Sequence, residues 1–190
     1  MVYDVKCLAE VLRSVSAEGM ESVIVGSTVY MLRLGIEEFE DDVDLFATNF
    51  SPVFDEDLIR EAAERIGCEV GVSEWGTPRL ECVVRDECIV PVELHENIHD
   101  FYVPPEMVED AETLTIEGFE VRVLRVEDYV LLKARAGRDR DLEDLNYIAD
   151  LIKSGTLKVD LRFVKERLRV FDEDEQKLIV RRLTDAGMRP

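Results

Sequence analysis

Two aspartates separated by one residue, Asp42 and Asp44, stand in the stretch DDVDLF at residues 41–46. Side chains of a β-strand alternate between its faces, so both carboxylates point the same way while Val43 and Leu45 point into the core. Carboxylates held side by side repel each other, and a hard divalent cation such as Mg²⁺ or Mn²⁺ relieves that repulsion. The pair therefore predicts a metal site on one face of a strand.

A Gly–Ser step, Gly26 and Ser27, lies between the apolar run SVIV and the helical pattern TVYMLRLG. Glycine lets the backbone approach a ligand closely. The hydroxyl of Ser27 and the free N–H groups of a helix start can bind a phosphate, although Ser27 is also the expected N-cap of that helix. A phosphate cradle beside paired carboxylates is what a metal–nucleotide site needs.

The stretch HENIH contains a different metal-binding motif, formed by His95, Glu96 and His99. H-E-x-x-H on a helix presents two imidazoles to zinc and a glutamate to the attacking water of a protease. Zinc proteases carry it inside a long helix, whereas here it follows the strand-like run CIVPVEL and stops at VPP. We interpret the match as coincidental and expect both histidines at the rim of the cleft.

The carboxylates need a sheet to hold them, and hydrophobic periodicity predicts one. Helical patterns cover residues 4–18, 27–35 and 55–67. A hairpin turns at Glu117–Gly118, and the pattern is helical from Val126 to the end. The predicted strands are SVIVG, VDLFA, CEVGVSE, RLECVVR and CIVPVEL. We expect an α/β (α+β) fold with a mixed-sheet core at residues 1–124 and a helical C-terminal module at residues 125–190.

The order of these motifs resembles the nucleotidyltransferase superfamily, the minimal polymerase-beta-like fold. Its pattern is h-G-[GS], then D-x-[DE] on the next strand, then a third acid on a later strand. Gly26 and Ser27 match the first part, and Asp42 and Asp44 match the second. The third falls on Glu93 in VPVELHE, where the flanking apolar residues alternate inward and leave the glutamate outward. The family usually has Asp at this position.

A downstream stretch, VEDYVLLKARAGRDRDLEDL, is similar to a segment of a nucleotidyltransferase-like branch that includes toxins of abortive-infection systems. Lys133, Arg138, Asp141 and Asp144 fall on that segment one by one. The same residues also fit an exposed helix face laced with surface ion pairs. Together the two matches span about residues 20–150.

The resemblance implies transfer of a nucleoside monophosphate from a nucleoside triphosphate to a hydroxyl of RNA, protein or a small molecule, with release of pyrophosphate. Mg²⁺ (or Mn²⁺) is the implied cofactor, and Glu93 would be a further ligand or the base for the acceptor hydroxyl. The implied catalytic and metal-binding residues are Asp42, Asp44 and Glu93. The implied nucleotide-binding residues are Gly26, Ser27, Lys133 and Arg138.

One departure keeps two alternatives open. The branch commonly has an Arg-x-Thr-x stretch before the two aspartates, where this chain has Glu38 and Glu40. Two negative charges in place of a cation suggest a degenerate protein that binds a nucleotide or a partner without turnover. The other alternative is a toxin-like interaction protein whose target is a cellular RNA or an antitoxin.

Composition sets the remaining expectations. A net charge of −20 over 190 residues excludes a broad basic surface for nonspecific nucleic-acid binding. No apolar run reaches membrane-spanning length and the start has no signal-peptide pattern, so a cytoplasmic protein is expected. The many carboxylates fit a protein adapted to heat or high salt. Cys68, Cys82 and Cys88 fall in strand-like runs and are expected to be buried free thiols.

Overall fold

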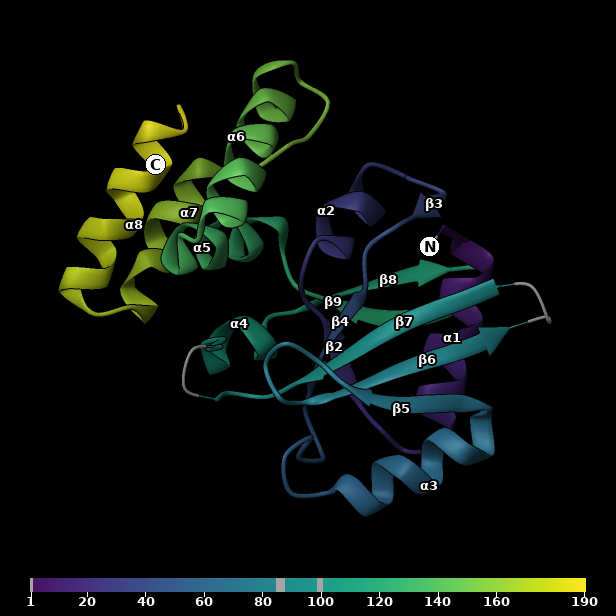
Figure 1. Cartoon of the computed structure of the whole chain (residues 1–190). Helices are drawn as coiled ribbons and strands as arrows, with labels where there is room; N and C mark the ends of the chain where they lie inside the picture. Colours follow the sequence, from purple (N-terminus) through teal and green to yellow (C-terminus); the bar gives the residue numbers. More distant parts are fainter. Residues whose placement is uncertain (1, 85–87, 99–100) are drawn as a thin grey trace. The chain divides into compact units, whose positions relative to one another are not determined.

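The computed structural model describes residues 2–84, 88–98 and 101–190. The chain forms two compact units (Figure 1). The first comprises Met1–Val103 and Ala111–Leu124, and the second comprises Pro104–Asp110 and Arg125–Pro190. The short segment 104–110, which the sequence pattern assigns to the core, thus belongs with the C-terminal helices.

The first unit is built on a seven-stranded sheet in the order β5-β6-β7-β4-β2-β9-β8. Strand β4 runs parallel to β7 and β2 runs parallel to β9, whereas the other neighbours are antiparallel. The mixed sheet expected from the sequence is therefore confirmed. The strands are β2 Ser22–Ile24, β4 Val43–Ala47, β5 Cys68–Val72, β6 Pro78–Val84, β7 Cys88–His95, β8 Glu112–Ile116 and β9 Phe119–Val123.

Two helices pack on this sheet: α1 (Val5–Ala17) contacts β6 and β7, and α3 (Glu56–Ile66) contacts β5 and β6. Asp4 caps α1 by accepting a hydrogen bond from the backbone N–H of Cys7 at 2.8 Å. Gly67 ends α3 in the left-handed conformation, which glycine adopts without strain. Both helices lie where the apolar periodicity predicts them.

The loop between the glycine motif and the paired aspartates holds more structure than the sequence indicates. Helix α2 (Thr28–Arg33) follows Ser27 as expected. The acidic stretch after it contains a short strand, β3 (Glu38–Phe39), which pairs antiparallel with β1 (Tyr3–Asp4). The chain start is thereby tied to the segment that leads into β4.

The prediction of free thiols is wrong. Cys68 and Cys82 form one disulfide and Cys7 and Cys88 form another. The first pair are direct partners across β5 and β6, with Cα atoms 4.1 Å apart. The second links the first turn of α1 to the start of β7, 81 residues later. Both pairings depend on contacts between distant segments, which strand periodicity does not reveal.

The second unit is helical, as predicted, and α5 packs against α6, α7 and α8 within it. Gly137 ends α5 in the left-handed conformation, and the guanidinium of Arg182 donates hydrogen bonds to the last carbonyls of that helix, Ala134 and Arg135, at 2.8 and 2.7 Å. Its elements are α4 Pro105–Glu109, α5 Val126–Ala136, α6 Asp139–Lys153, α7 Leu161–Arg167, the short 3₁₀ turn η1 Leu168–Val170, and α8 Glu173–Asp185. In the described part of the chain, no helix has the length and apolarity needed to cross a membrane.

Candidate metal and nucleotide site

A row of charged side chains crosses the middle of the sheet. Asp44 on β4 is the direct partner of Glu93 on β7, and Glu93 is the partner of Arg79 on β6. Asp42, just before β4, and His95, the last residue of β7, extend the row at its two ends. The residues between them point to the other face and are buried: Val43, Leu45, Leu80, Val92 and Leu94. The alternation predicted for both strands therefore brings Asp44 and Glu93 together.

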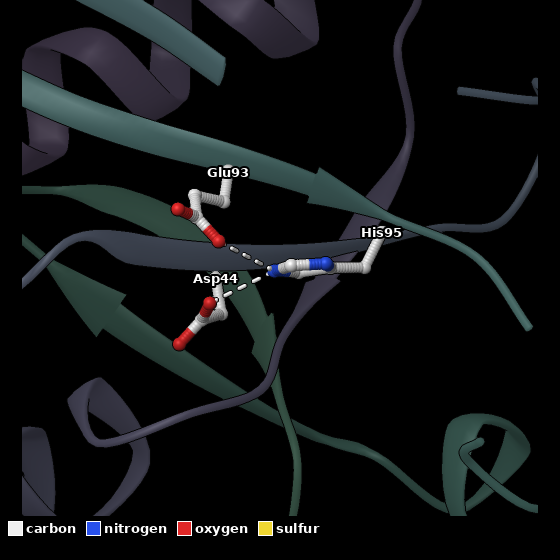
Figure 2. A group of neighbouring side chains, drawn as sticks. All are labelled: Asp44, Glu93 and His95. Atoms are coloured by element: carbon white, nitrogen blue, oxygen red, sulfur yellow. Dashed lines mark hydrogen bonds and ion pairs between the residues drawn. The ribbon is translucent and has the colours of Figure 1, made fainter. Parts of the chain in front are cut away.

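Asp44, Glu93 and His95 form a compact cluster (Figure 2). One ligand atom from each lies within 4.8 Å of the other two. The Nε2 atom of His95 is 2.8 Å from Oδ1 of Asp44 and 3.6 Å from Oε2 of Glu93. Two carboxylates and one imidazole that converge in this way are donors that a divalent cation can use.

His95 is buried inside this site rather than placed at its rim, which corrects the sequence-based expectation. Its side chain is 1% exposed, and its ring stacks on Phe101 with centroids 4.4 Å apart. Trp75 contacts the edge of Phe101 in turn. Among the described residues, Nδ1 of His95 has no hydrogen-bond partner, so the imidazole is directed through Nε2 toward the carboxylates. His99 lies outside the described residues.

The rest of the H-E-x-x-H motif has a structural role. His95 ends strand β7 and is not part of a helix, so the helical zinc-protease geometry is absent from the described residues. The Glu96 carboxylate accepts hydrogen bonds from the Ser51 hydroxyl at 2.8 Å and from the Val53 backbone N–H at 3.0 Å. Glu96 therefore fixes the loop before α3, and the interpretation of the motif as coincidental agrees with this geometry.

Gly26 makes the close approach that its residue type indicates, but to a protein side chain. Its φ is +41°, and a Cβ atom at this position would overlap the carboxylate of Asp44. The backbone N–H of Val25 also donates to the Asp44 carbonyl at 2.9 Å. The turn after β2 is thus in close contact with Asp44.

Ser27 occupies the N-cap position of α2 without a side-chain capping bond. Its hydroxyl donates instead to the carboxylate of Asp41 at 3.2 Å. The expected side-chain cap is therefore not formed, and the hydroxyl is directed toward the segment that carries the paired aspartates.

Asp42 is held by a residue that sequence reasoning missed. Arg79 donates from Nε and from its terminal amino group to the two carboxylate oxygens of Asp42, each at 3.1 Å. It also pairs with Glu81, and its Nε lies 4.0 Å from Glu93. The alternation in PRLECVV places Arg79 and Glu81 on the outward face, but only the register of β6 against β7 shows that they reach the site.

The electrostatics of the site centre on Glu93, whose side chain is 13% exposed. Burial, together with the neighbouring carboxylate of Asp44, raises the pKa of Glu93 to about 7, and His95 opposes that rise. Hydrogen bonding to Asp42 raises the pKa of Arg79 above its ordinary value, so the guanidinium stays charged. Glu93 can therefore gain or lose a proton near neutral pH.

The basic residues of the downstream motif lie in the second unit and are engaged by its acids. Nζ of Lys133 is 3.0 Å from Asp141 and 2.7 Å from Asp144. Nε of Arg138 donates to Asp141 at 2.8 Å, and the backbone N–H of Arg138 donates to the same carboxylate. Asp141 is almost fully buried, so these pairs also hold the α5–α6 corner together.

The acids that depart from the family pattern, Glu38 and Glu40, are both exposed beside β3. Arg33, the cation on the neighbouring helix α2, pairs with Glu112 of β8. Arg79 is therefore the cation that reaches the aspartate pair in the described structure, and it comes from another strand.

The fold of this chain is also found in a solved structure. No curated protein matches the sequence. A crystal structure of an antigenic nucleotidyltransferase-like protein from Paracoccidioides brasiliensis has the same fold, with a TM-score of 0.59 and 15% identity over 96% of this chain and 88% of that one. The complex of ANT(2")-Ia with adenylyl-2"-tobramycin aligns with a TM-score of 0.45 and 17% identity over 95% of this chain and 97% of that one.

The family comparison covers almost the whole chain. A family model described as "Nucleotidyl transferase of unknown function" matches residues 4–185, which include every residue of the cluster and most of both units. The chain belongs to this nucleotidyltransferase family.

Proposed function

We propose that the protein transfers a nucleoside monophosphate from a metal-bound nucleoside triphosphate to a hydroxyl group and releases pyrophosphate. The observation that carries the proposal is the direct pairing of Asp44 with Glu93 across parallel strands, with the Gly26 turn packed against Asp44. Family membership supports a nucleotide as the substrate.

The donor set fits a divalent cation. Asp44 and Glu93 offer the oxygen ligands that Mg²⁺ and Mn²⁺ prefer, and the imidazole of His95 is a donor that Mn²⁺ tolerates better than Mg²⁺. Among the described residues, the buried Nδ1 of His95 has no hydrogen-bond partner. No hydrogen bond on that side of the ring therefore turns Nε2 away from the carboxylates. When bound, the cation would supply charge stabilisation at the α-phosphoryl oxygens.

The protein's own residues then divide the work. Asp44 would hold the metal–triphosphate, and the backbone after Gly26 with the Ser27 hydroxyl would face the phosphates. Glu93 would serve either as a further ligand of the cation or as the base that accepts the proton of the acceptor hydroxyl. The acceptor oxygen forms a bond to the α-phosphorus while the bond from that phosphorus to the bridging oxygen breaks, and pyrophosphate leaves.

Lys133 and Arg138 are proposed to bind nucleotide on the basis of the downstream motif alone. In the structure their charged groups pair with acids of the second unit, Asp141 and Asp144. Binding of a phosphate would require these ion pairs to open.

A degenerate, non-catalytic nucleotide-binding protein is the second candidate. Its specific support is that Asp42 is paired with the guanidinium of Arg79 and that Asp44 is in hydrogen-bond contact with Nε2 of His95. Protein in which these contacts persist would bind nucleotide weakly and release no pyrophosphate.

The two candidates separate in one assay. The protein is incubated with each of the four nucleoside triphosphates, labelled at the α-phosphate, with Mg²⁺ or Mn²⁺. RNA, the protein itself and small polyhydroxyl compounds are offered as acceptors. Covalent labelling of any acceptor with release of pyrophosphate supports transfer, whereas metal-dependent nucleotide binding without either product supports the degenerate protein.

A further inference from the structure

We propose that Arg79 is a displaceable counterion of this site. In the free protein it neutralises Asp42, and when a metal–triphosphate binds it passes to the phosphates and releases Asp42 as a metal ligand. This inference rests on the proposed function, because it assigns a role to a residue of the same site. It adds a cation that neither the glycine motif nor the downstream basic motif contains.

The Arg79–Asp42 ion pair involves both carboxylate oxygens. Arg79 engages both oxygens of Asp42 in a two-pronged contact, with both distances at 3.1 Å. Guanidinium and carboxylate match well in this arrangement, and such a carboxylate has little capacity left for a metal ion. Asp42 can become a ligand only if Arg79 moves.

The two aspartates, Asp42 and Asp44, have different partners. Asp44 converges with Glu93 and His95 on one potential ion, and this cluster does not include Asp42. A first metal ion thus needs three donors that are already in place. A second ion near Asp42 would need the carboxylate that Arg79 now binds. The guanidinium thus supplies the positive charge beside Asp42 that this second ion would otherwise supply.

Arg79 is accessible to solvent and has other acidic neighbours. Its side chain is 26% exposed, compared with 1% for His95, so solvent already reaches the guanidinium. Glu81 lies two residues along the same strand and Glu93 lies 4.0 Å from Nε, which gives the arginine alternative acidic neighbours during the exchange. A triphosphate carries more negative charge than one carboxylate and accepts the same paired hydrogen bonds.

The test measures two equilibria in wild-type protein and in Arg79→Gln. One is Mn²⁺ binding, followed by the electron paramagnetic resonance signal of the free ion. The other is binding of inorganic tripolyphosphate in the presence of Mn²⁺, followed by calorimetry, which makes the result independent of the base. Neither measurement requires turnover.

We expect Arg79→Gln to bind Mn²⁺ about tenfold more tightly, or to bind one additional ion, because Asp42 is released. We expect the same variant to bind tripolyphosphate roughly tenfold more weakly, because a charge-assisted contact is lost. Opposite changes in the two affinities are the signature of a counterion that changes partner. A residue that only supports the fold would weaken both.

Two further variants control the experiment. Arg60→Gln removes the same charge from an exposed position on α3 and should change neither equilibrium beyond twofold. Arg79→Lys keeps the charge but loses the two-pronged contact, and we expect its Mn²⁺ affinity to lie between those of the wild type and Arg79→Gln. If Arg79→Gln does not fold, the lysine variant carries the test.

The outcomes separate this inference from the proposed function. If the wild type binds Mn²⁺ and tripolyphosphate and Arg79→Gln matches it in both, the counterion role is overturned while the site stands. Wild-type protein that binds Mn²⁺ but not tripolyphosphate overturns the transfer of Arg79 to phosphate. Absence of Mn²⁺ binding by the wild type removes the metal site itself, and both proposals fail.

Discussion

At Gly26 the absence of a side chain has a specific structural consequence. The backbone φ of +41° disfavours any larger residue, and the space that a Cβ atom would occupy is filled by the carboxylate of Asp44. The backbone conformation of Gly26 and the position of the Asp44 carboxylate are therefore coupled. The Gly–Ser step in the sequence indicates a close approach, but it does not indicate that the approaching group is this aspartate.

Substitution Gly26→Ala should displace Asp44 and weaken Mn²⁺ binding about tenfold or more. It should also destabilise the fold by about 1–3 kcal/mol because of the positive φ. The matched control is Gly19→Ala, since Gly19 also has a positive φ, +79°, but has open space around its Cβ position. Denaturant unfolding and Mn²⁺ titration of both variants test this coupling. Equal Mn²⁺ affinity in Gly26→Ala and wild type would contradict it.

Glu93 should show a conflict between stability and metal binding. Because burial raises its pKa from 4.5 to about 7, the folded state holds a proton that the unfolded state has released between those values. The contribution of this group to the unfolding free energy is present below pH 4.5 and is lost as the pH rises through about 7. Charged Glu93 thus opposes folding at alkaline pH.

We therefore expect Glu93→Gln, which imitates the protonated form, to be more stable than the wild type near pH 8 by about 1–3 kcal/mol. The difference should vanish near pH 4, and the variant should lose Mn²⁺ binding at every pH. Urea unfolding across this range provides the measurement, with Glu64→Gln on the exposed side of α3 as the control. A Glu93→Gln variant that is less stable than the wild type near pH 8 would show that the charged carboxylate does not lower the unfolding free energy.

At the scale of elements, the features that depend on local sequence patterns could be predicted, whereas those that depend on strand register could not. The alternation of VDLFA and VPVEL gave the outward direction of Asp44 and Glu93, and their pairing across β4 and β7 followed once the strands lay side by side. Helices α1, α3 and α5 formed where apolar periodicity and glycine stops indicated. These features depend on residues close together in sequence.

The missed features depend on residues far apart. The contact of Arg79 with Asp42 requires three strands in a defined register, and no short window of the sequence contains both partners. The Cys68–Cys82 disulfide requires the pairing of β5 with β6. His95 was misjudged because the predicted strand ended at Leu94, whereas β7 continues one residue further and carries the imidazole into the site.

The α5–α6 corner supports a prediction about Lys133. Its ammonium pairs with Asp141, which is 1% exposed, and with Asp144. Lys133→Ala should lower the unfolding free energy by about 1.5–3 kcal/mol, because a buried carboxylate loses a charged hydrogen-bond donor. If the lysine also reaches phosphate, the folded variant should bind the metal–nucleotide complex about tenfold more weakly.

Arg135→Ala is the comparison for that change. Arg135 pairs with Glu175 at 2.7 Å, and both side chains are about a third exposed, so the cost should be at most about 1 kcal/mol. Nucleotide affinity should stay close to that of the wild type. Calorimetric titration of the two variants gives the answer: a Lys133→Ala variant with altered stability but unchanged affinity would limit this lysine to a structural role.

At the scale of the whole molecule, the first unit is closed covalently as well as by packing. One disulfide joins residues 14 apart and the other joins residues 81 apart. By the loop-entropy estimate these bonds stabilise the fold by about 3 and about 4–5 kcal/mol respectively. The longer loop contains β2, β4, β5 and β6, so it encloses most of the strands that carry the site.

Reduction should therefore lower the unfolding midpoint strongly, and Cys7→Ser with Cys88→Ser should cost more than Cys68→Ser with Cys82→Ser. Thermal unfolding with and without a reductant, together with thiol titration of the unfolded chain, tests this expectation. Four reactive thiols in the unreduced, unfolded protein would show that neither bond forms. An unchanged midpoint after reduction would show that the bonds contribute no stability.

The central claim is that the cluster of Asp44, Glu93 and His95 supports attack on the α-phosphorus of a nucleoside triphosphate. The most direct measurement compares nucleotide labelled at the α-phosphate with nucleotide labelled at the γ-phosphate, in wild-type protein and in Asp44→Asn, at saturating Mg²⁺ or Mn²⁺. We expect the α-label to become covalently attached to an acceptor and the γ-label to appear in pyrophosphate, with both products lost in Asp44→Asn. Transfer of the γ-label to the acceptor, or equal rates in wild type and Asp44→Asn, would contradict the account.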